Sequence, residues 1–271
     1  MDQEKIEKLG RRLESTLPLV GGILRRSACR RLAEDSSAAA VPNLVGALHS
    51  QEPTVRNVAQ SALRSLQDPG AVDELCWQWC QDRDPRLGRL VAECGYVARE
   101  PLVLRVLSAL KAGRPELAGE QAKQVDALFQ HGVVHLVDAL SDEDTDIAAN
   151  AEVALRSLKN PGAVDALCGH WCEDRNQRLG QFIGECDYVA REPVNVRVLS
   201  ALKAGRPDLA GEQAEQVPHL VEALSDKDTD IAENAGVALC SLANPGAVDA
   251  MCAHWCEDRN QRLGQFIGEC D

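Results

Sequence analysis

The chain has 271 residues, a net charge of −13, 45% hydrophobic residues and only 3% aromatic ones. So few aromatic residues argue against a β-sandwich or barrel, because large side chains fill such sheets. The hydrophobic fraction is high enough for burial to offset the entropy of ordering, which excludes a disordered chain.

The negative charge lies outside the N-terminal part. Residues 1–40 carry eight Lys/Arg and six Asp/Glu, which leaves 21 positive and 36 negative side chains, a net of −15, for residues 41–271. Such a surface repels phosphate backbones, so we expect no nucleic-acid partner and leave basic or neutral protein partners open. A basic cluster near the N-terminus is interpreted as a solvated face, with contact to phosphate or an acidic partner as the alternative: Arg25, Arg26, Arg30 and Arg31.

The eleven cysteines are odd in number and sit inside helical patterns rather than in loops. This distribution indicates free thiols in a reducing compartment rather than a secreted disulfide framework. No export signal begins the chain, and no apolar run approaches the roughly 20 residues of a membrane span. We therefore expect a cytoplasmic protein without membrane contact.

The first 40 residues are predicted to form a divergent helical cap. The next two helices are joined by a polar turn at residues 50–53, whose proline suits a first helical turn. Further helices are predicted near residues 71–82 and 86–95, and from Pro101 to Lys111. The second helix after the cap carries a stripe of helical spacing: Val55, Val58, Ala59, Ala62, Leu63 and Leu66. Residues 117–124 are read either as a short helix or as a lead into the next one.

Internal repeats dominate the sequence. Residues 160–187 recur as 244–271 with 26 of 28 positions identical, and 95–124 recur as 187–216 with 24 of 30 identical. The predicted organisation is a cap (1–40), a first module (41–132, with an insertion at 125–132), a second module (133–216) and an incomplete third module (217–271). Because the chain stops within a module, we expect a fragment or truncated array that self-associates through its uncapped C-terminal end.

One stretch resembles a known repeat family. Residues 40–48, followed by Pro53-Thr-Val-Arg56 and the small-residue stripe from Ala59 to Leu66, are similar to short HEAT repeats of the phycobilisome-lyase type. The later modules depart from this pattern, since Ile147-Ala148 and Ile231-Ala232 replace Val55-Arg56. The resemblance implies an all-α, right-handed, armadillo-like α-solenoid of about nine short hairpins, each buried against its neighbours.

Cysteines recur as a triad in every module. Cysteines four residues apart on a helix share a face and are candidate zinc ligands, although a fourth ligand is missing because His170 points away from Cys168 and Cys172. The favoured interpretation is core packing, since cysteine often behaves as a small hydrophobe. The triads are Cys76, Cys80, Cys94; Cys168, Cys172, Cys186; and Cys252, Cys256, Cys270.

The tryptophans Trp79, Trp171 and Trp255 share the same stripes and are predicted to be core residues, with a partly exposed anchor in a groove as the alternative. Trp77 has no counterpart and is predicted to be exposed. Asn150 and Asn234 replace Val58 on an apolar stripe. A buried Asn must be hydrogen-bonded, so we expect one such residue per module to link hairpins, with a ligand contact as the alternative.

Two acidic turns begin like calcium loops, at residues 142–146 and 226–230. Ile147 stands where a calcium loop needs glycine, and Val153 where it needs a bidentate glutamate. These acids are therefore interpreted as helix N-caps and first-turn residues that complement the helix dipole.

The pattern as a whole favours a non-catalytic scaffold without a cofactor that binds a protein partner along its concave face. The alternatives are a HEAT-like bilin lyase that handles a tetrapyrrole, a HEAT-like DNA glycosylase, which the acidic charge opposes, and a regulatory repeat fragment of a larger protein. Outward positions of the second helices are the candidate contacts: Arg86, Arg89, Glu93, Arg178, Gln181, Glu185, Arg262, Gln265 and Glu269.

Overall fold

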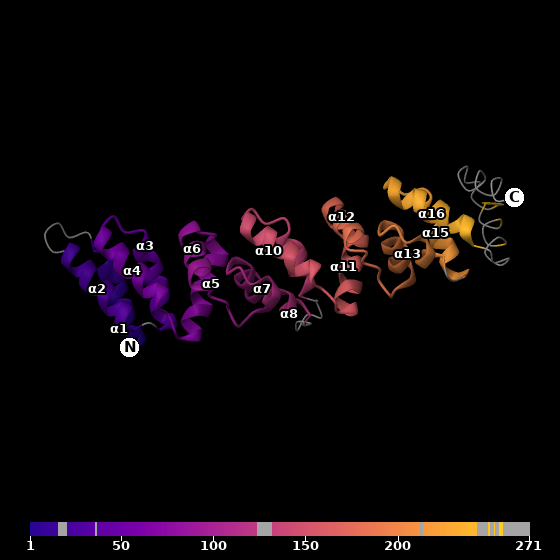
Figure 1. Cartoon of the computed structure of the whole chain (residues 1–271). Coiled ribbons are helices and arrows are strands. Elements are labelled where there is room, and N and C mark those ends of the chain that lie inside the picture. The colour runs from indigo at the N-terminus through magenta and orange to yellow at the C-terminus, as the bar shows by residue number, and fades with distance from the viewer. Residues whose placement is uncertain are drawn as a thin grey trace. The chain divides into compact units, whose positions relative to one another are not determined.

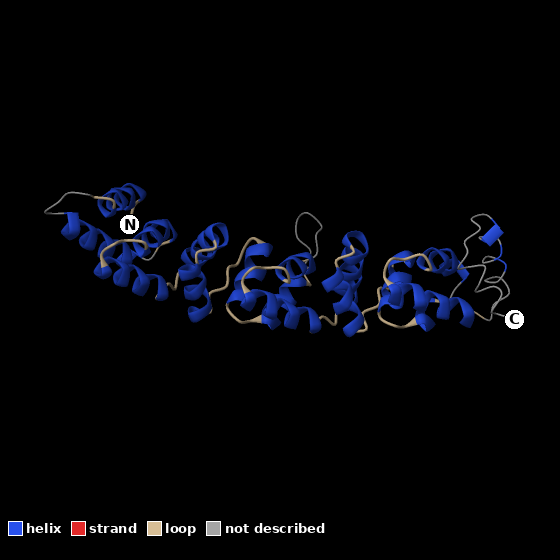
Figure 2. Cartoon of the chain, turned by 90° about the horizontal axis from the view of Figure 1, so that it is seen from above, coloured by secondary structure: helices blue, strands red, loops and turns tan. Residues whose placement is uncertain are grey.

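Helices form every regular element that the structure describes (Figures 1 and 2). The computed structural model describes residues 1–15, 21–35, 37–123, 132–211 and 214–242, together with 249, 252, 255 and 256. Within these residues there are sixteen α-helices, two short 3-10 helices and no strand. The predicted all-α class is therefore confirmed.

The chain divides into two compact units, Met1–Ser157 and Leu158–Asp271. The border between them falls inside the second sequence module, so the units and the repeats have different limits. The insertion predicted at 125–132 lies outside the described residues except for Gly132, as does much of the third module after residue 242.

In the first unit, helices that follow one another in the chain pack side by side (Figure 1). Thus α1 packs on α2, α3 on α4, and α7 on α8. The bounds are α1 Gln3–Leu13, α2 Gly21–Asp35, η1 Ala38–Ala40, α3 Val41–Leu48, α4 Pro53–Arg64, α5 Pro69–Asp82, α6 Pro85–Cys94, α7 Leu102–Lys111, α8 Pro115–Ala122, α9 Val133–Ala139 and α10 Thr145–Arg156.

The second unit repeats this order of packing, with α11 on α13, α13 on α14 and α16, and α15 on α16. Stacking of hairpins in chain order is the arrangement of an α-solenoid, as the sequence predicted. The bounds are α11 Pro161–Asp174, α12 Gln177–Glu185, α13 Val194–Lys203, α14 Pro207–Ala210, η2 Ala214–Gln216, α15 Val217–Ala223 and α16 Thr229–Ser241.

Local start signals explain where many helices begin. The side chain of Asp68 accepts a hydrogen bond from the N–H of Ala71 at 2.9 Å, directly ahead of Pro69 at the first position of α5. Asn160 does the same for α11 by accepting from Gly162 at 2.9 Å. A capping side chain satisfies an orphan N–H, and proline has none to satisfy at this position.

The core consists of the small apolar stripes that the sequence predicted. Val55, Ala59 and Leu63 of α4 are 0–1% exposed, and Leu66 is buried just beyond the helix. Val58 is half-buried at the edge of the stripe. Of the segment at 117–124, for which two predictions were open, residues 117–122 belong to the short helix α8, and residue 124 lies outside the described residues.

The N-terminal helices α1 and α2 pack against each other, and α2 packs against α3 and α4. Ile6 and Leu9 of α1 and Leu32 of α2 are buried. Arg25 forms an ion pair with Glu52, in the turn before α4. Part of the basic cluster therefore holds α2 against the first module rather than standing only in solvent.

Hydrogen bonds to backbone carbonyls link neighbouring hairpins. Asn150 Nδ2 on α10 donates to the carbonyl oxygen of Leu110 on α7 at 2.9 Å, and Asn234 Nδ2 on α16 donates to that of Leu202 on α13 at 2.8 Å. The predicted link between hairpins is thus confirmed, and in each case the Asn adds a second donor to a helix-end carbonyl that already accepts the N–H of Gly113 or Gly205 at 3.1 Å.

Replacing Asn150 by aspartate tests this link. In Asn150→Asp the donor becomes an oxygen that faces the Leu110 carbonyl, so we expect the free energy of unfolding to fall by about 1–3 kcal/mol. Gln81→Glu, at an exposed position of α5, is the control and should change it by less than about 0.5 kcal/mol. Urea unfolding followed by circular dichroism measures both. Equal losses in the two variants would contradict the link.

Candidate binding grooves

An arginine in the left-handed conformation follows the tryptophan helix in each unit. Arg83 has φ 49° and caps α5 by donating its N–H to the Trp79 carbonyl at 2.8 Å. Its guanidinium lies over the Trp79 ring, 5.3 Å from the centroid, and 3.0 Å from Asp142. In the second unit Arg175 has φ 50°, lies 5.2 Å from the Trp171 centroid and 3.1 Å from Asp226.

This backbone conformation is uncommon for a residue with a side chain, and costs about 1 kcal/mol or more. The cation–π contact and the ion pair offset that cost, because both need the guanidinium folded back over the helix end. Trp79 and Trp171 are each 2% exposed, so their predicted place in the core is confirmed, while Trp77 is 45% exposed, as also predicted.

The acidic turns face these arginines. In each unit the tryptophan, the arginine, a lysine and the acidic turn surround a groove, and we call this set of residues the frame of the groove. Asp144 caps α10 by accepting from the N–H of Asp146 at 3.2 Å, and its other oxygen lies 2.6 Å from Lys111 Nζ. Asp142 accepts from the N–H of Asp144 at 3.0 Å and pairs with Arg83. Lys203, Asp226, Asp228 and Asp230 repeat this arrangement in the second unit.

The predicted N-cap role of these turns is confirmed. Their carboxylates are bound by an arginine and a lysine of the same unit. Within the part of the chain that the structure describes, no three His, Cys, Asp or Glu side chains come together as a metal site.

A glycine allows the closest contact in the frame. A Cβ atom at Gly88 would lie 3.0 Å from Trp79 Nε1 and 3.3 Å from Lys111 Cε. At Gly180 it would lie 2.6 Å from Trp171 Nε1. Real Cβ atoms do not approach a neighbour as closely as 2.6 Å, so Gly180 needs glycine for the tryptophan ring to pack, whereas a side chain at Gly88 would require the ring to shift by a few tenths of an ångström.

Each frame encloses an open groove, which we call the tryptophan groove of that unit. The groove measures about 670 Å³ in the first unit and 1330 Å³ in the second. The frame is the same in both, whereas the rim differs. The rim pairs, first unit before second, are Pro85 and Gln177, Arg89 and Gln181, Ala92 and Gly184, and Glu143 and Lys227.

The frame is also electrostatically matched. Burial opposes ionisation of Asp144, but the hydrogen bond and charge of Lys111 outweigh it and lower the pKa of that carboxyl. Burial likewise disfavours the charged form of Lys203, but its bonds to Asp228 and Asp230 raise its pKa. Both ion pairs are therefore stable across the neutral range.

The first cysteine of the triad packs as a small apolar side chain in the first two modules, whereas Cys256 of the third is exposed, contrary to the prediction of core packing. Cys76 and Cys168 are fully buried, and burial raises the pKa of each thiol to about 12. Cys172 is half-buried, with its pKa raised to about 11 for the same reason, and Cys186 is half-buried on the next helix. A thiol with so high a pKa is a poor nucleophile, and the full burial of Cys76 and Cys168 fits the packing interpretation.

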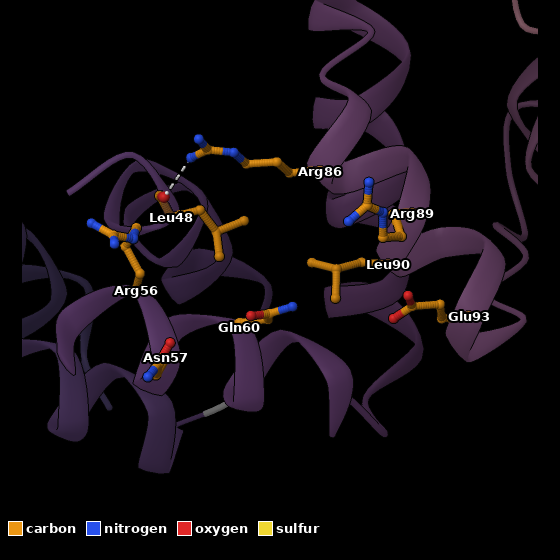
Figure 3. A pocket seen from close by; sticks show the side chains of 8 residues that line it. All are labelled: Leu48, Arg56, Asn57, Gln60, Arg86, Arg89, Leu90 and Glu93. Carbon is orange, nitrogen blue, oxygen red and sulfur yellow. Dashed lines mark hydrogen bonds between the residues drawn. The ribbon is translucent and has the colours of Figure 1, made fainter. Parts of the chain in front are cut away.

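The candidate contact residues separate into three groups. Arg86, Arg89 and Glu93 of α6 line a second, smaller groove against α4 (Figure 3). Gln181 and Glu185 of α12 line the second tryptophan groove, whereas Arg178 of the same helix does not. The predicted contacts Arg262, Gln265 and Glu269 lie outside the described residues.

Several groove residues were not singled out from the sequence. Arg83, Lys111 and Gln60 belong to different helices, and only stacking brings them to a groove. The repeats do hold a signal for the first of these, because Arg follows Trp after three residues at Trp79–Arg83, Trp171–Arg175 and Trp255–Arg259. A cation–π contact between a tryptophan and the arginine that ends its helix requires this constant spacing.

No protein-family model matches the chain, and no curated protein matches it in sequence. Among solved structures, an engineered protein is 19% identical, with 92% of this chain and 81% of that chain covered and a TM-score of 0.29. Human deoxyhypusine hydroxylase in complex with glycerol is 21% identical, with 99% and 95% covered and a TM-score of 0.22. Neither superposition is close enough to support an inference.

The fold and its grooves define the class. The chain is an all-α helical-repeat protein whose hairpins stack in chain order, with a tryptophan groove in each compact unit. No helix in the described residues is both long and apolar enough to cross a lipid bilayer.

Adding a methyl group at Gly180 tests the close contact. In Gly180→Ala the Cβ meets Trp171 Nε1, so we expect unfolding to become easier by about 1–3 kcal/mol, despite the better helix propensity of alanine. Gly169→Ala on α11, where a Cβ has no neighbour within 4 Å, is the matched control and should be neutral or stabilising by up to about 1 kcal/mol. Thermal unfolding of the two variants separates these outcomes, and a stabilised Gly180→Ala would refute the contact.

Removing the lysine charge tests the ion pair. In Lys111→Met no lysine counteracts the effect of burial, so the pKa of the Asp144 carboxyl should rise. In the native chain the pair's stabilisation is present above the usual Asp pKa of about 3.9 and is lost as pH falls through the lowered value. Titration of the Asp144 carboxyl carbon by NMR should therefore show a higher midpoint in Lys111→Met. An unchanged midpoint would mean that the lysine does not act on this carboxyl.

Proposed function

We propose that the chain is a non-catalytic scaffold that binds a protein partner along the faces that carry α6 and α12. In HEAT-like solenoids the second helices of successive hairpins line the concave face, and that face is where extended ligands bind. The observation that carries the proposal is the tryptophan groove, which occurs in both units with a constant frame and a different rim.

The frame supports recognition rather than chemistry. Arg83, Lys111 and their acidic partners neutralise one another, and the nearby thiols have pKa values near 12. The side chains that vary between the grooves are at the open edge, where Arg89 is replaced by Gln181 and Glu143 by Lys227. Two grooves with the same frame but different rim residues are suited to binding different parts of one partner.

A charge change at the second rim tests the proposal. Gln181→Glu with Lys227→Glu alters the rim, and Gln67→Glu with Lys159→Glu makes the same changes at exposed loop positions outside the grooves. The immobilised native chain first retains partners from a lysate of its source, and these are identified by mass spectrometry. Titration of a purified partner should then show about a tenfold loss of affinity, about 1.4 kcal/mol, for the rim variant.

The control variant should bind like the native chain. Equal binding by all three proteins would contradict a partner seated on the rim. Failure to retain any protein in near-stoichiometric amount would contradict the scaffold itself.

A further inference from the structure

The smaller groove between α4 and α6 of the first unit is unusually basic for this chain. It measures about 230 Å³ and opens between facing side chains of the two helices (Figure 3). We call it the arginine groove. Its lining residues are Leu48, Arg56, Asn57, Gln60, Arg86, Arg89, Leu90 and Glu93.

Backbone carbonyls hold two of its guanidinium groups. Arg86 Nη1 donates to the carbonyl oxygen of Leu48 at 2.9 Å, as the dashed line in Figure 3 marks. Arg56 Nη1 donates to that of Ser50 at 2.7 Å. These bonds fix the two head groups but leave their charge uncompensated, and each guanidinium retains other N–H donors.

The groove lacks internal counter-ions. Within the described residues, Arg56, Arg86 and Arg89 form no ion pair, and Glu93, the one acid of the lining, is paired with Arg64 at 2.5 Å. Other arginines of this unit do have carboxylate partners, as Arg83 has in Asp142. Three positive charges therefore gather at one place on a chain whose net charge is −13.

Duplication does not account for this cluster, because the later modules lack it. Arg86 is retained as Arg178 and Arg262, but alanine (Ala148, Ala232) corresponds to Arg56 and glutamine (Gln181, Gln265) to Arg89. The basic set is thus particular to the first module, whereas the tryptophan groove is common to both units.

Guanidinium groups prefer carboxylates, which they bind through paired N–H donors. The amides of Asn57 and Gln60 provide donors and acceptors for a peptide backbone, and Leu48 and Leu90, 5% and 2% exposed, form an apolar floor. The small volume suits a few residues of an extended segment. The net charge of −15 over residues 41–271 opposes a long polyanion such as nucleic acid.

We propose that the arginine groove binds an acidic segment of the partner protein, with its Asp or Glu carboxylates held by Arg56, Arg86 and Arg89. This inference rests on the proposed scaffold function and names the chemistry of the partner at one site.

Fluorescence anisotropy with the full chain tests the inference. The probes are a short labelled peptide rich in Asp and Glu, the same peptide with Asn and Gln in their place, and a labelled single-stranded DNA of similar length. The groove variant is Asn57→Asp with Gln60→Glu, since neither side chain takes part in a hydrogen bond or ion pair among the described residues and neither lines a tryptophan groove. Gln67→Glu with Gln81→Glu, at exposed positions, carries the same change in net charge.

The acidic peptide should bind the native chain and the control alike, and bind the groove variant at least about tenfold more weakly, about 1.4 kcal/mol. Equal binding of the amide peptide, or an equal loss in the control, would overturn the inference. Tighter binding of the DNA would also overturn it and assign the groove to phosphates. If the native chain does not bind the acidic peptide but still captures a partner through the rim of the second tryptophan groove, the arginine groove alone is refuted.

Discussion

A short hairpin of this chain cannot bury its apolar stripe by itself, so each one depends on contact with the next. The polar contacts between hairpins decide how those stripes meet. One of them joins Lys111, at the end of α7, to Asp144, at the start of α10, at 2.6 Å. Because Asp144 also caps α10, a single carboxylate both begins a helix and fixes it against its neighbour.

Arg83 adds a second constraint to the same frame. Its left-handed backbone would be unfavourable alone, and contact with Trp79 and Asp142 stabilises it. The groove is therefore a consequence of how the hairpins are joined, because the residues that join them also form its walls. The same reasoning explains why the frame recurs in the second unit while the rim does not.

Charge is arranged differently in the two kinds of groove. In the tryptophan grooves, basic and acidic frame residues neutralise one another within the unit. In the arginine groove, two arginines are held by neutral carbonyls, and their charge remains available to a ligand. The first arrangement stabilises the stack, and the second creates a local positive potential on an acidic protein, which favours association with acidic segments.

The sequence by itself determined the helices and much of their burial. Proline and Asp or Asn at helix starts, the small apolar stripes, the capping role of Asp144 and the buried position of Trp79 all depend on neighbours within a few turns of one helix. Asn150 was also predictable as a link, because a polar residue on an apolar stripe needs a hydrogen-bond partner.

Only the tertiary structure decided which side chains share a groove. Arg83 meets Asp142, and Arg56 lies across from Arg89, because hairpins distant in the sequence stack at a particular angle and distance. Helical periodicity is a local property and assigns a residue to a face, but it does not assign the residue on another helix that the face will meet. That choice depends on the packing of whole hairpins, so the grooves appeared only when the helices were in place.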